Sequence, residues 1–404
     1  MGCCTAHAIN IVEANENDLK EKKIIISNRL SAPISILNYR GRENPLEEDQ
    51  EKFIMVKKIG KSTICHCYLI RSVETKDEYA YKKIDISDAN DDSVKRIKND
   101  MEMLKTLNHP NVILYVNSFF SDDQKTLHLF TEYADGGDLQ IKLDENKNKK
   151  EYFDEGTLLD WLMQICLALK YIHEKNIIHR DIKPSNILLM DNIAKLGDFG
   201  VAKALNSNLK HAKTMVATPQ YVAPEIINKQ NYSFKADIWS LGVIFFQLMY
   251  LNYPFEGSTD EEMQKNIVDG KRKEISISYS YDSKLIELIN KMLSKRPEER
   301  PTAEEILDNT IISTRMSCYL KENEYDQLIA TKTIKEYENE IAKINENKRE
   351  RKIKIIEDDE IKEFIKPENV ELFDKKRNEK VIYDLNRQMT LMKEVLIKKT
   401  KTCK

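Results

Sequence analysis

The local sequence pattern changes once, at the Gly-Gly pair of residues 136–137, and this change constrains the fold more than any other feature. Between residues 53 and 133, short runs rich in β-branched and aromatic residues predict strands, and one helix-like segment interrupts them at about 92–107. After the pair, apolar residues recur at helical spacing, as in the segment 157–176. The sequence therefore predicts an α+β domain over 53–313, with a small strand-rich lobe (53–133), a larger helical lobe (134–313) and a cleft between them, where ligands commonly bind.

Two flanking regions differ from this central part. Residues 1–52 are mixed and weakly periodic, whereas residues 314–404 are rich in Lys, Glu, Ile and Asn. Two hypotheses are open for this tail: short coiled coils that self-associate or bind a cytoskeletal partner through residues 320–404, or a charged amphipathic helix folded back on the domain. Both rest on apolar residues that step by three and four over about two heptads, namely Ile334, Tyr337, Ile341 and Ile344, and then Ile382, Leu385, Met389, Met392 and Leu396.

Composition excludes several classes of protein. A formal net charge of −3 in 404 residues argues against a nucleic-acid binder, which would be clearly basic. Seven cysteines are too few, and odd in number, for a disulfide scaffold, so we expect a reducing, cytoplasmic location. The most apolar stretch, residues 238–255, is short and interrupted by polar residues, so it predicts a buried helix and not a membrane span.

Three short motifs follow one another in the helical lobe. Residues 177–189 read IIHRDIKPSNILL, residues 197–200 read GDFG, and residues 223–225 read APE. An Ala-x-Lys triplet at 80–82 lies upstream in a predicted strand. In this order the motifs are the signature of protein kinases, so residues 53–313 resemble a eukaryotic protein kinase domain. The resemblance implies the bilobal kinase fold and the use of ATP with Mg²⁺.

The residue types suit phosphoryl transfer, which depends on positioning and charge neutralisation more than on covalent help. Asp181 would act as the catalytic base on the substrate hydroxyl, and Lys183 would reach the transferring phosphate. Asn186 and Asp198 are hard oxygen ligands suited to Mg²⁺. Lys82 would hold the α- and β-phosphates from the strand lobe. These five residues form the predicted catalytic set.

The resemblance also implies a set of nucleotide contacts by motif matching. Thr131 would be the gatekeeper and Glu132 to Ala134 the hinge, while Asp138 would lie near the ribose and Leu188 under the adenine. The full set expected at the nucleotide is Ile59, Gly60, Lys61, Ser62, Cys65, Cys67, Ala80, Lys82, Thr131, Glu132, Ala134, Asp138 and Leu188.

The stretch IGKSTICHCYLI, residues 59–70, admits three interpretations: a phosphate loop short of glycines, a Cys-His-Cys metal site, or an ordinary strand. The kinase pattern G-x-G-x-x-G-x-V falls on Gly60, Ser62, Cys65 and Cys67, so only its first glycine is present. Glycines let backbone N–H groups approach phosphate, and Ser62 substitutes only in part, so we expect weaker nucleotide binding or a loop that sits higher. If 64–70 is a strand, Cys65 and Cys67 face one side and His66 the other, which argues against the metal site.

A second departure concerns the helix that normally supplies a glutamate to the strand lysine. The matching position is Asp100, one methylene shorter, so its pair with Lys82 would need the helix to move in or a bridging water. Glu102 lies on the opposite face of that helix and does not replace it. Arg180 would receive a phosphate from the activation segment 198–225, with Thr214 as the first candidate; the alternative is that Thr214 is an ordinary loop residue.

The N-terminal residues MGCC resemble an acylation signal. Gly2 would carry a myristoyl chain and Cys3 and Cys4 palmitoyl chains, and two chains anchor a protein to a membrane stably where one does not. Position 6 is Ala6, where Ser or Thr is preferred, so a terminus with two free thiols is the alternative.

Further segments place the resemblance within the superfamily. Lys183 after Asp181, with Thr218 before the APE motif, resembles serine/threonine kinases, and the stretches EYADGGDL and TPQYVAPEI resemble the NIMA-related (NEK) kinases. Glu225 and Arg300 would form the structural ion pair of the family. Two hypotheses follow: an active serine/threonine kinase acting on protein substrates, or a pseudokinase that binds nucleotide weakly and acts through its helical tail. The complete catalytic set favours the enzyme.

Overall fold

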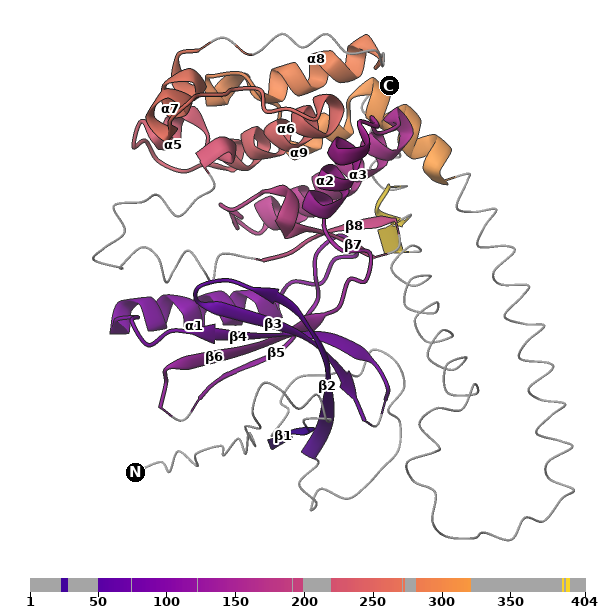
Figure 1. The fold of residues 1–404 in the computed structure, drawn as a ribbon. Helices are drawn as coiled ribbons and strands as arrows, with labels where there is room; N and C mark the ends of the chain where they lie inside the picture. Colours follow the sequence, from indigo (N-terminus) through magenta and orange to yellow (C-terminus); the bar gives the residue numbers. More distant parts are fainter. Residues whose placement is uncertain are drawn as a thin grey trace, which may run out of the picture.

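The computed structural model has a sheet lobe and a helical lobe that meet just after Glu132 (Figure 1). The sequence predictions for Gly2, Cys3, Cys4 and Thr214, and for the first tail seam at 334–344, lie outside the described residues. The structure describes residues 23–27, 50–73, 75–121, 123–190, 192–198, 219–270, 272, 281–320, 387–388 and 390–392.

The small lobe is an antiparallel sheet with strand order β1-β2-β3-β4-β6-β5 and one helix, α1 (Asp91–Lys105). Five of its strands and α1 confirm the elements predicted between residues 53 and 133. The backbone of β1 pairs with the start of β2, an addition that the weakly periodic sequence before residue 50 did not predict. The strands are β1 (Lys23–Ser27), β2 (Gln50–Lys61), β3 (Cys65–Ser72), β4 (Glu78–Asp85), β5 (Tyr115–Phe120) and β6 (Thr126–Glu132).

Strand alternation decides which side chains face the cleft between the lobes. In the register of β3 and β4, Cys67 lies opposite Lys82, and Tyr68 lies opposite Tyr81. Directly opposed residues share a face of the sheet, and neighbours along a strand point to opposite faces. One face therefore presents Cys67 and Lys82 together, whereas Tyr68 and Tyr81 belong to an aromatic cluster on the other face.

Helix α1 forms because its ends and its apolar spacing both favour it. The Asn90 side chain caps the first turn by accepting a 2.9 Å hydrogen bond from the Ser93 N–H, and acidic residues follow it. Ile97, Met101 and Leu104, spaced by four and three, are buried in the same core as the inward-facing residues of β4 and β6. This packing fixes which face of α1 lies against the sheet.

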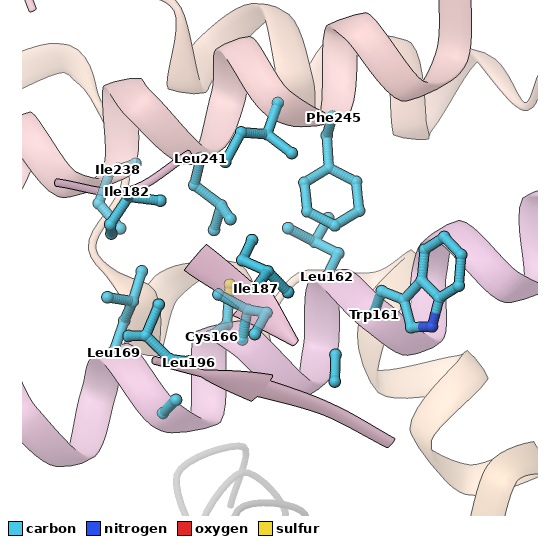
Figure 2. Close-up of a cluster of buried hydrophobic side chains, with 14 of the residues drawn as sticks. Trp161, Leu162, Cys166, Leu169, Ile182, Ile187, Leu196, Ile238, Leu241 and Phe245 are labelled. Atoms are coloured by element: carbon cyan, nitrogen blue, oxygen red, sulfur yellow. The ribbon is translucent and has the colours of Figure 1, made fainter. Parts of the chain in front are cut away.

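The helical lobe is built around two long helices, α3 (Glu155–Glu174) and α6 (Phe234–Tyr250). Figure 2 shows their apolar side chains meeting those of the short hairpin β7–β8, with Leu162 and Leu169 on one side and Leu241 and Phe245 on the other. The remaining elements are α2 (Leu139–Lys149), η1 (Pro184–Asn186), β7 (Ile187–Met190), β8 (Ile193–Leu196), η2 (Pro219–Tyr221), α5 (Pro224–Ile227), α7 (Asp260–Val268), α8 (Ser283–Met292), η3 (Pro297–Glu299) and α9 (Ala303–Leu307).

Residues 238–250 of the apolar stretch form most of α6, and residues 251–255 follow its end. Nearly every residue of the helix is buried, as predicted. Within the described part of the chain, no helix combines the length and the apolar character that crossing a membrane requires. The apolar character of α6 is thus used for packing inside the lobe.

A buried ion pair joins two distant segments of this lobe, as the family resemblance implied. Both terminal nitrogens of Arg300 donate 2.7 Å hydrogen bonds to the Glu225 carboxylate, and the guanidinium lies 4.9 Å from the centre of the Trp239 ring. The core also continues past residue 313, because residues 310–320 are helical and Met316, Tyr319 and Leu320 are buried in it.

Candidate active site

The predicted catalytic loop, residues 179–186, is held at both ends by the apolar core. Ile182 and Ile187 are buried among side chains of α3 and α6 (Figure 2), and Asp181, Lys183 and Asn186 lie beside or between them. Pro184 begins the short turn η1, where its missing N–H is not needed for a hydrogen bond. The polar catalytic side chains therefore stand on a backbone that packing fixes.

Asp181 is oriented by the two polar residues predicted to act with it. Lys183 Nζ lies 2.9 Å from Asp181 Oδ2, and Asn186 Nδ2 donates to the same oxygen at 3.0 Å and to the Asp181 carbonyl at 2.7 Å. Both side-chain contacts reach Oδ2, so the described residues leave Oδ1 available to a substrate hydroxyl. The structure thus brings together three of the five predicted catalytic residues.

Asp237, at the start of α6, braces this loop from below. Its side chain is about 1% exposed and accepts hydrogen bonds from the N–H groups of His179 and Arg180, at 2.9 and 3.0 Å, and from His173 Nε2 at 2.9 Å. Arg180 has a φ of +68°, a strained value for a residue with a side chain, which these bonds hold in place. Sequence reasoning missed Asp237 as a site residue, although the stretch DIWSLG marks its position.

His179 connects the catalytic loop to the segment after β8 that carries Asp198. Its Nε2 donates a 2.9 Å hydrogen bond to the Gly197 carbonyl, and its Nδ1 lies 3.4 Å from the Asp181 N–H. Burial lowers the pKa of His179, so its ring is neutral with one nitrogen donating and the other accepting. The loop and the segment before Asp198 are therefore fixed relative to each other.

Lys82 reaches from the small lobe to Asp198 and closes the cleft. Its Nζ bonds Asp198 Oδ1 directly, and Asp198 adopts a φ of +57°. Burial lowers the pKa of Lys82, while the nearby thiols of Cys67 and Cys65 raise it. The ion pair brings the remaining two predicted catalytic residues together across the lobes.

Asp100 takes a different position from the one that a pairing glutamate would have. Among the described residues it forms no ion pair with Lys82, which uses Asp198 as its carboxylate partner. Asp100 is half-buried; burial raises its pKa, and the nearby Arg180 guanidinium lowers it. The carboxylate on α1 is thus close enough to the arginine of the catalytic loop to be influenced by its charge, a relation that the sequence did not predict.

The turn between β2 and β3 carries the incomplete glycine pattern. Gly60 pairs with Cys67 in the hairpin, and the turn closes on itself: the Ser62 N–H donates to the Cys65 carbonyl at 2.7 Å, and the Cys65 N–H donates to Ser62 Oγ at 3.1 Å. Two N–H groups that could meet a phosphate are therefore already paired. This is a physical reason for the weak phosphate binding that we expect.

The Cys-His-Cys interpretation of this hairpin is not supported. Cys65 and Cys67 share the face of Lys82, whereas His66 Nδ1 lies 3.3 Å from the hydroxyl of Tyr68 on the other face. The described part of the chain has no group of three or more metal-binding side chains of the His, Cys, Asp and Glu types. Burial raises the pKa of both thiols, so they are protonated at neutral pH.

The segment joining the lobes positions the predicted adenine contacts. Thr131 lies opposite Ala80 in the sheet, and Leu188 bridges to Asp138. Ala134 and Leu188 share a small apolar cluster, and Asp138 Oδ1 caps α2 by accepting from the Ile141 N–H at 2.9 Å. The other predicted contacts lie on the β2 hairpin, where Ile59 and Lys61 are exposed.

Glu132 makes a buried contact that sequence reasoning did not find. Lys195 Nζ lies 3.1 and 3.3 Å from its two carboxylate oxygens, and both side chains are about 2% exposed. Glu132 Oε1 also accepts a 2.8 Å hydrogen bond from the Leu114 N–H. The pair ties the hinge to β8, three residues before Asp198, and only the KLGDFG context of Lys195 offered a signal for it.

The donor set fits a nucleotide and a magnesium ion. Asn186 uses its amide nitrogen on Asp181, which leaves its amide oxygen as a ligand, and the Asp198 side chain is 47% exposed. Both are hard oxygen donors of the kind Mg²⁺ prefers. A Cβ added to Gly60 would meet only Cys67 Cβ, at an ordinary 3.5 Å, so packing within the chain does not require this glycine and room for a ligand explains it better.

A bilobal fold with this site defines a protein kinase domain, and the comparisons agree. The protein kinase domain family matches residues 53–312. Serine/threonine-protein kinase Nek1 of Mus musculus is 34% identical over 288 residues, 71% of this chain and 23% of that protein. Nek5 of Homo sapiens is 34% identical over 272 residues, 67% and 38% of the two chains, and Nek2 of Homo sapiens is 34% identical over 270 residues, 65% and 60%.

The chain belongs to the protein kinase family, and its kinase domain is similar to those of the NIMA-related serine/threonine kinases. It spans 23% to 60% of the length of these three relatives. The similarity therefore concerns the kinase domain and not the whole of the larger proteins.

Proposed function

We propose that the chain is an active serine/threonine kinase that transfers the γ-phosphate of ATP to hydroxyl groups of protein substrates. The single observation that carries this proposal is the joined geometry of Asp181, Lys183 and Asn186, with Lys82 on Asp198 across the cleft. Family membership and the serine/threonine kinases among the relatives support the same reaction.

Each residue has a role that its position supports. Asp181 orients the acceptor hydroxyl and accepts its proton at Oδ1, while Lys183 holds Oδ2 and lies where it can neutralise developing phosphate charge. Asn186 and Asp198 would hold Mg²⁺, which when bound neutralises charge on the phosphate oxygens. Lys82 would hold the phosphates from above.

The pseudokinase alternative receives no support from the site. Every residue of the predicted catalytic set is present, and each one described lies in contact with another member of the set. The departures at Ser62, Cys65 and Asp100 concern how nucleotide is held, not the groups that touch the transferring phosphate.

The proposal is tested by γ-phosphate transfer to a generic protein acceptor, comparing the wild type with Asp181→Asn at equal concentration. The variant keeps the size of the side chain and removes the base, so we expect transfer to fall by about 10²–10⁴-fold. A control variant, Asp308→Asn, changes an exposed carboxylate away from the cleft and should leave the rate unchanged. Equal transfer by wild type and Asp181→Asn would refute the proposal.

We further propose the regulation and location that the sequence suggested. Phosphate on Thr214 would pair with Arg180, and acyl chains on Gly2, Cys3 and Cys4 would attach a cytoplasmic kinase to a membrane surface. Free thiols at Cys65, Cys67, Cys166 and Cys318 support a reducing compartment. Mass spectrometry of the protein from its native cell would report these modifications, and their absence from all four sites would refute this part.

Self-association or a cytoskeletal partner is proposed for the first tail seam, residues 334–344. The second seam contains Met392, whose burial in the kinase domain core gives it a different use. Sedimentation of the full chain and of a form ending at residue 320 tests whether the tail makes the protein self-associate. If both forms are monomers, self-association through the tail is wrong.

A further inference from the structure

The last described segment of the chain, residues 387–388 and 390–392, contacts the core of the kinase domain and the loop between α1 and β5. In Figure 1 it is the yellow segment next to β7 and β8. Gln388 and Met392 are fully buried, and Thr390 between them is exposed. Residues four apart lie on one face of a helix, so this short helical segment presents one buried face to the domain.

The apolar part of this contact belongs to the main core. Met392 is a member of the same core cluster as Met316, Tyr319 and Leu320 at the end of the helical lobe. The second seam of the tail therefore packs against its own domain at Met392, as the hypothesis of a folded-back helix predicted. Burial of a methionine side chain supplies the hydrophobic part of the attachment.

A chain of hydrogen bonds runs from this segment to strand β8. The hydroxyl of Tyr319 donates to Gln388 Oε1 at 3.3 Å and accepts from Gln164 Nε2 at 3.2 Å. Gln164 Oε1 accepts from the Ala194 N–H at 2.7 Å, and the Ala194 carbonyl accepts from Asn111 Nδ2 at 2.9 Å. This chain of hydrogen bonds thus reaches Ala194, which lies next to Lys195 and four residues before Asp198.

The other end of the segment holds the loop between α1 and β5. Arg387 donates to the side chain and the carbonyl of Asn108, the latter at 2.5 Å, and the Asn108 N–H donates to the Tyr171 hydroxyl at 2.9 Å. His109 stacks on Tyr171, and its Nδ1 accepts from the Asn111 N–H at 3.0 Å. Burial and the nearby charge of Arg387 lower the pKa of His109 to about 3, so the ring stays neutral, as this acceptor role requires.

We propose that the segment formed by residues 387–388 and 390–392 is a docking element of the kinase domain, bound in cis, that holds the α1–β5 loop and β8 in place behind the active site. Two contacts carry the effect forward. The loop continues to Leu114, whose N–H binds the hinge residue Glu132, and β8 carries Lys195, which binds the same carboxylate and leads to Asp198.

One polar group of the docked segment is not satisfied. Gln388 Nε2 is buried and has no hydrogen-bond partner in the described part of the structure. An unpaired buried donor reduces the net stabilisation from the contact. Residues 321–386 are also long enough for the segment to leave its site or to reach a second copy of the chain. The test must therefore distinguish docking in cis from docking on a second copy.

Hydrogen exchange on the full chain tests the proposal directly. We compare the wild type with Met392→Asp, which places a charge in the core contact, and with Arg387→Ala, which removes only the contact with Asn108. Met392→Asp should speed exchange at amides of residues 107–114 and 193–198 by about tenfold or more, because local opening becomes easier. Arg387→Ala should raise exchange by a smaller factor, confined to 107–112.

Thr390→Ser, which keeps the hydroxyl group, is the matched control, since Thr390 is exposed on the same segment. The rates of amide hydrogen exchange in this variant should equal those in the wild type. If Met392→Asp does not fold, Arg387→Ala decides: unchanged protection of 107–112 would overturn the proposal, as would unchanged protection in Met392→Asp. Protection of these amides that rises with protein concentration, together with a dimer in sedimentation, would mean that the segment docks on a second copy of the chain. That result would overturn docking in cis.

Discussion

The two sides of the cleft hold their functional residues in different ways. On the helical side, Asp181 is fixed by Lys183 and Asn186. Below them, the fully buried Asp237 accepts two hydrogen bonds from the loop backbone and a third from a histidine of α3. On the sheet side, the hairpin that should cover the phosphates closes on itself through Ser62 and Cys65. The groups predicted to act on the transferring phosphate are held rigidly by the core, whereas the hairpin predicted to hold the nucleotide is not.

This difference separates two functions within one site. Groups that touch the transferring phosphate depend on exact placement, so they stand on packed backbone with several partners each. Groups that cover the nucleotide contribute binding energy, which can change without altering the chemical step. The departures from the kinase pattern are therefore expected to change ATP affinity more than the maximal rate.

The largest expected effect comes from breaking the buried pair on the helical side. Glu225→Ala would leave the fully buried Arg300 guanidinium without its carboxylate, and breaking such a pair costs about 3–5 kcal/mol of stability. Urea unfolding at pH 7 measures this loss. Glu298→Ala, which removes an exposed partner of Arg296 at 3.9 Å, is the control and should cost about 0–1 kcal/mol. Similar losses in both variants would contradict the assigned role of the pair.

Acid should destabilise the sheet side through His128. Its Nδ1 accepts a 2.7 Å hydrogen bond from the Tyr81 hydroxyl, and burial lowers its pKa to about 4. The unfolded chain binds a proton near pH 6.5, so the stabilisation is present above that pH and is lost as pH falls toward 4. Between pH 6.5 and 4.5 the loss should be about 2 kcal/mol, and His128→Asn should lack it. Equal pH dependence of unfolding in the two proteins would exclude His128 as the source.

A smaller effect is expected from lengthening the short carboxylate of α1. Asp100→Glu would bring the carboxylate closer to Lys82, and a hydrogen bond to a charged group is worth about 1.5 kcal/mol, or roughly tenfold in rate at most. We expect kcat/KM for ATP to rise about three- to tenfold. Glu102→Asp, on the opposite face of the helix where Glu102 pairs with Lys105, is the control and should have no effect. A fall in kcat/KM for Asp100→Glu would show that the electrostatic interaction of Asp100 with Arg180 matters more.

Much of the fold followed from local pattern. The strands, α1 and the buried α6 were predictable because their periodicity and end signals agree with the final packing. The strand β1 was not, since its sequence carries no clear alternation and its pairing with β2 spans a long sequence separation. The choice between a folded-back tail and a coiled coil at Met392 also needed the structure, because the same seam serves both.

The candidate site likewise contains some features that the sequence predicted and others that needed the structure. Motif spacing named the residues that we propose meet the transferring phosphate, because the chemistry allows few alternatives at those positions. It did not show that Lys82 contacts Asp198, that the charge of Arg180 acts on Asp100 or that Glu132 binds Lys195, since these interactions join distant segments. The same holds for Asp237, a positioning residue whose bonds to His173, His179 and Arg180 appear only when α3, α6 and the catalytic loop pack together.

One measurement tests the comparison most directly: the ATP saturation curve of phosphate transfer, for the wild type and for Ser62→Gly/Cys65→Gly. The double variant removes Ser62 Oγ and so frees the N–H of residue 65, while the backbone bond from the N–H of residue 62 to the carbonyl of residue 65 stays possible. It also removes the side chains that crowd the phosphate region. We predict that KM for ATP falls about three- to tenfold, with kcat changed by less than about twofold, because only nucleotide binding improves. No transfer by the wild type at saturating ATP, or a rise in kcat with KM unchanged, would contradict the account.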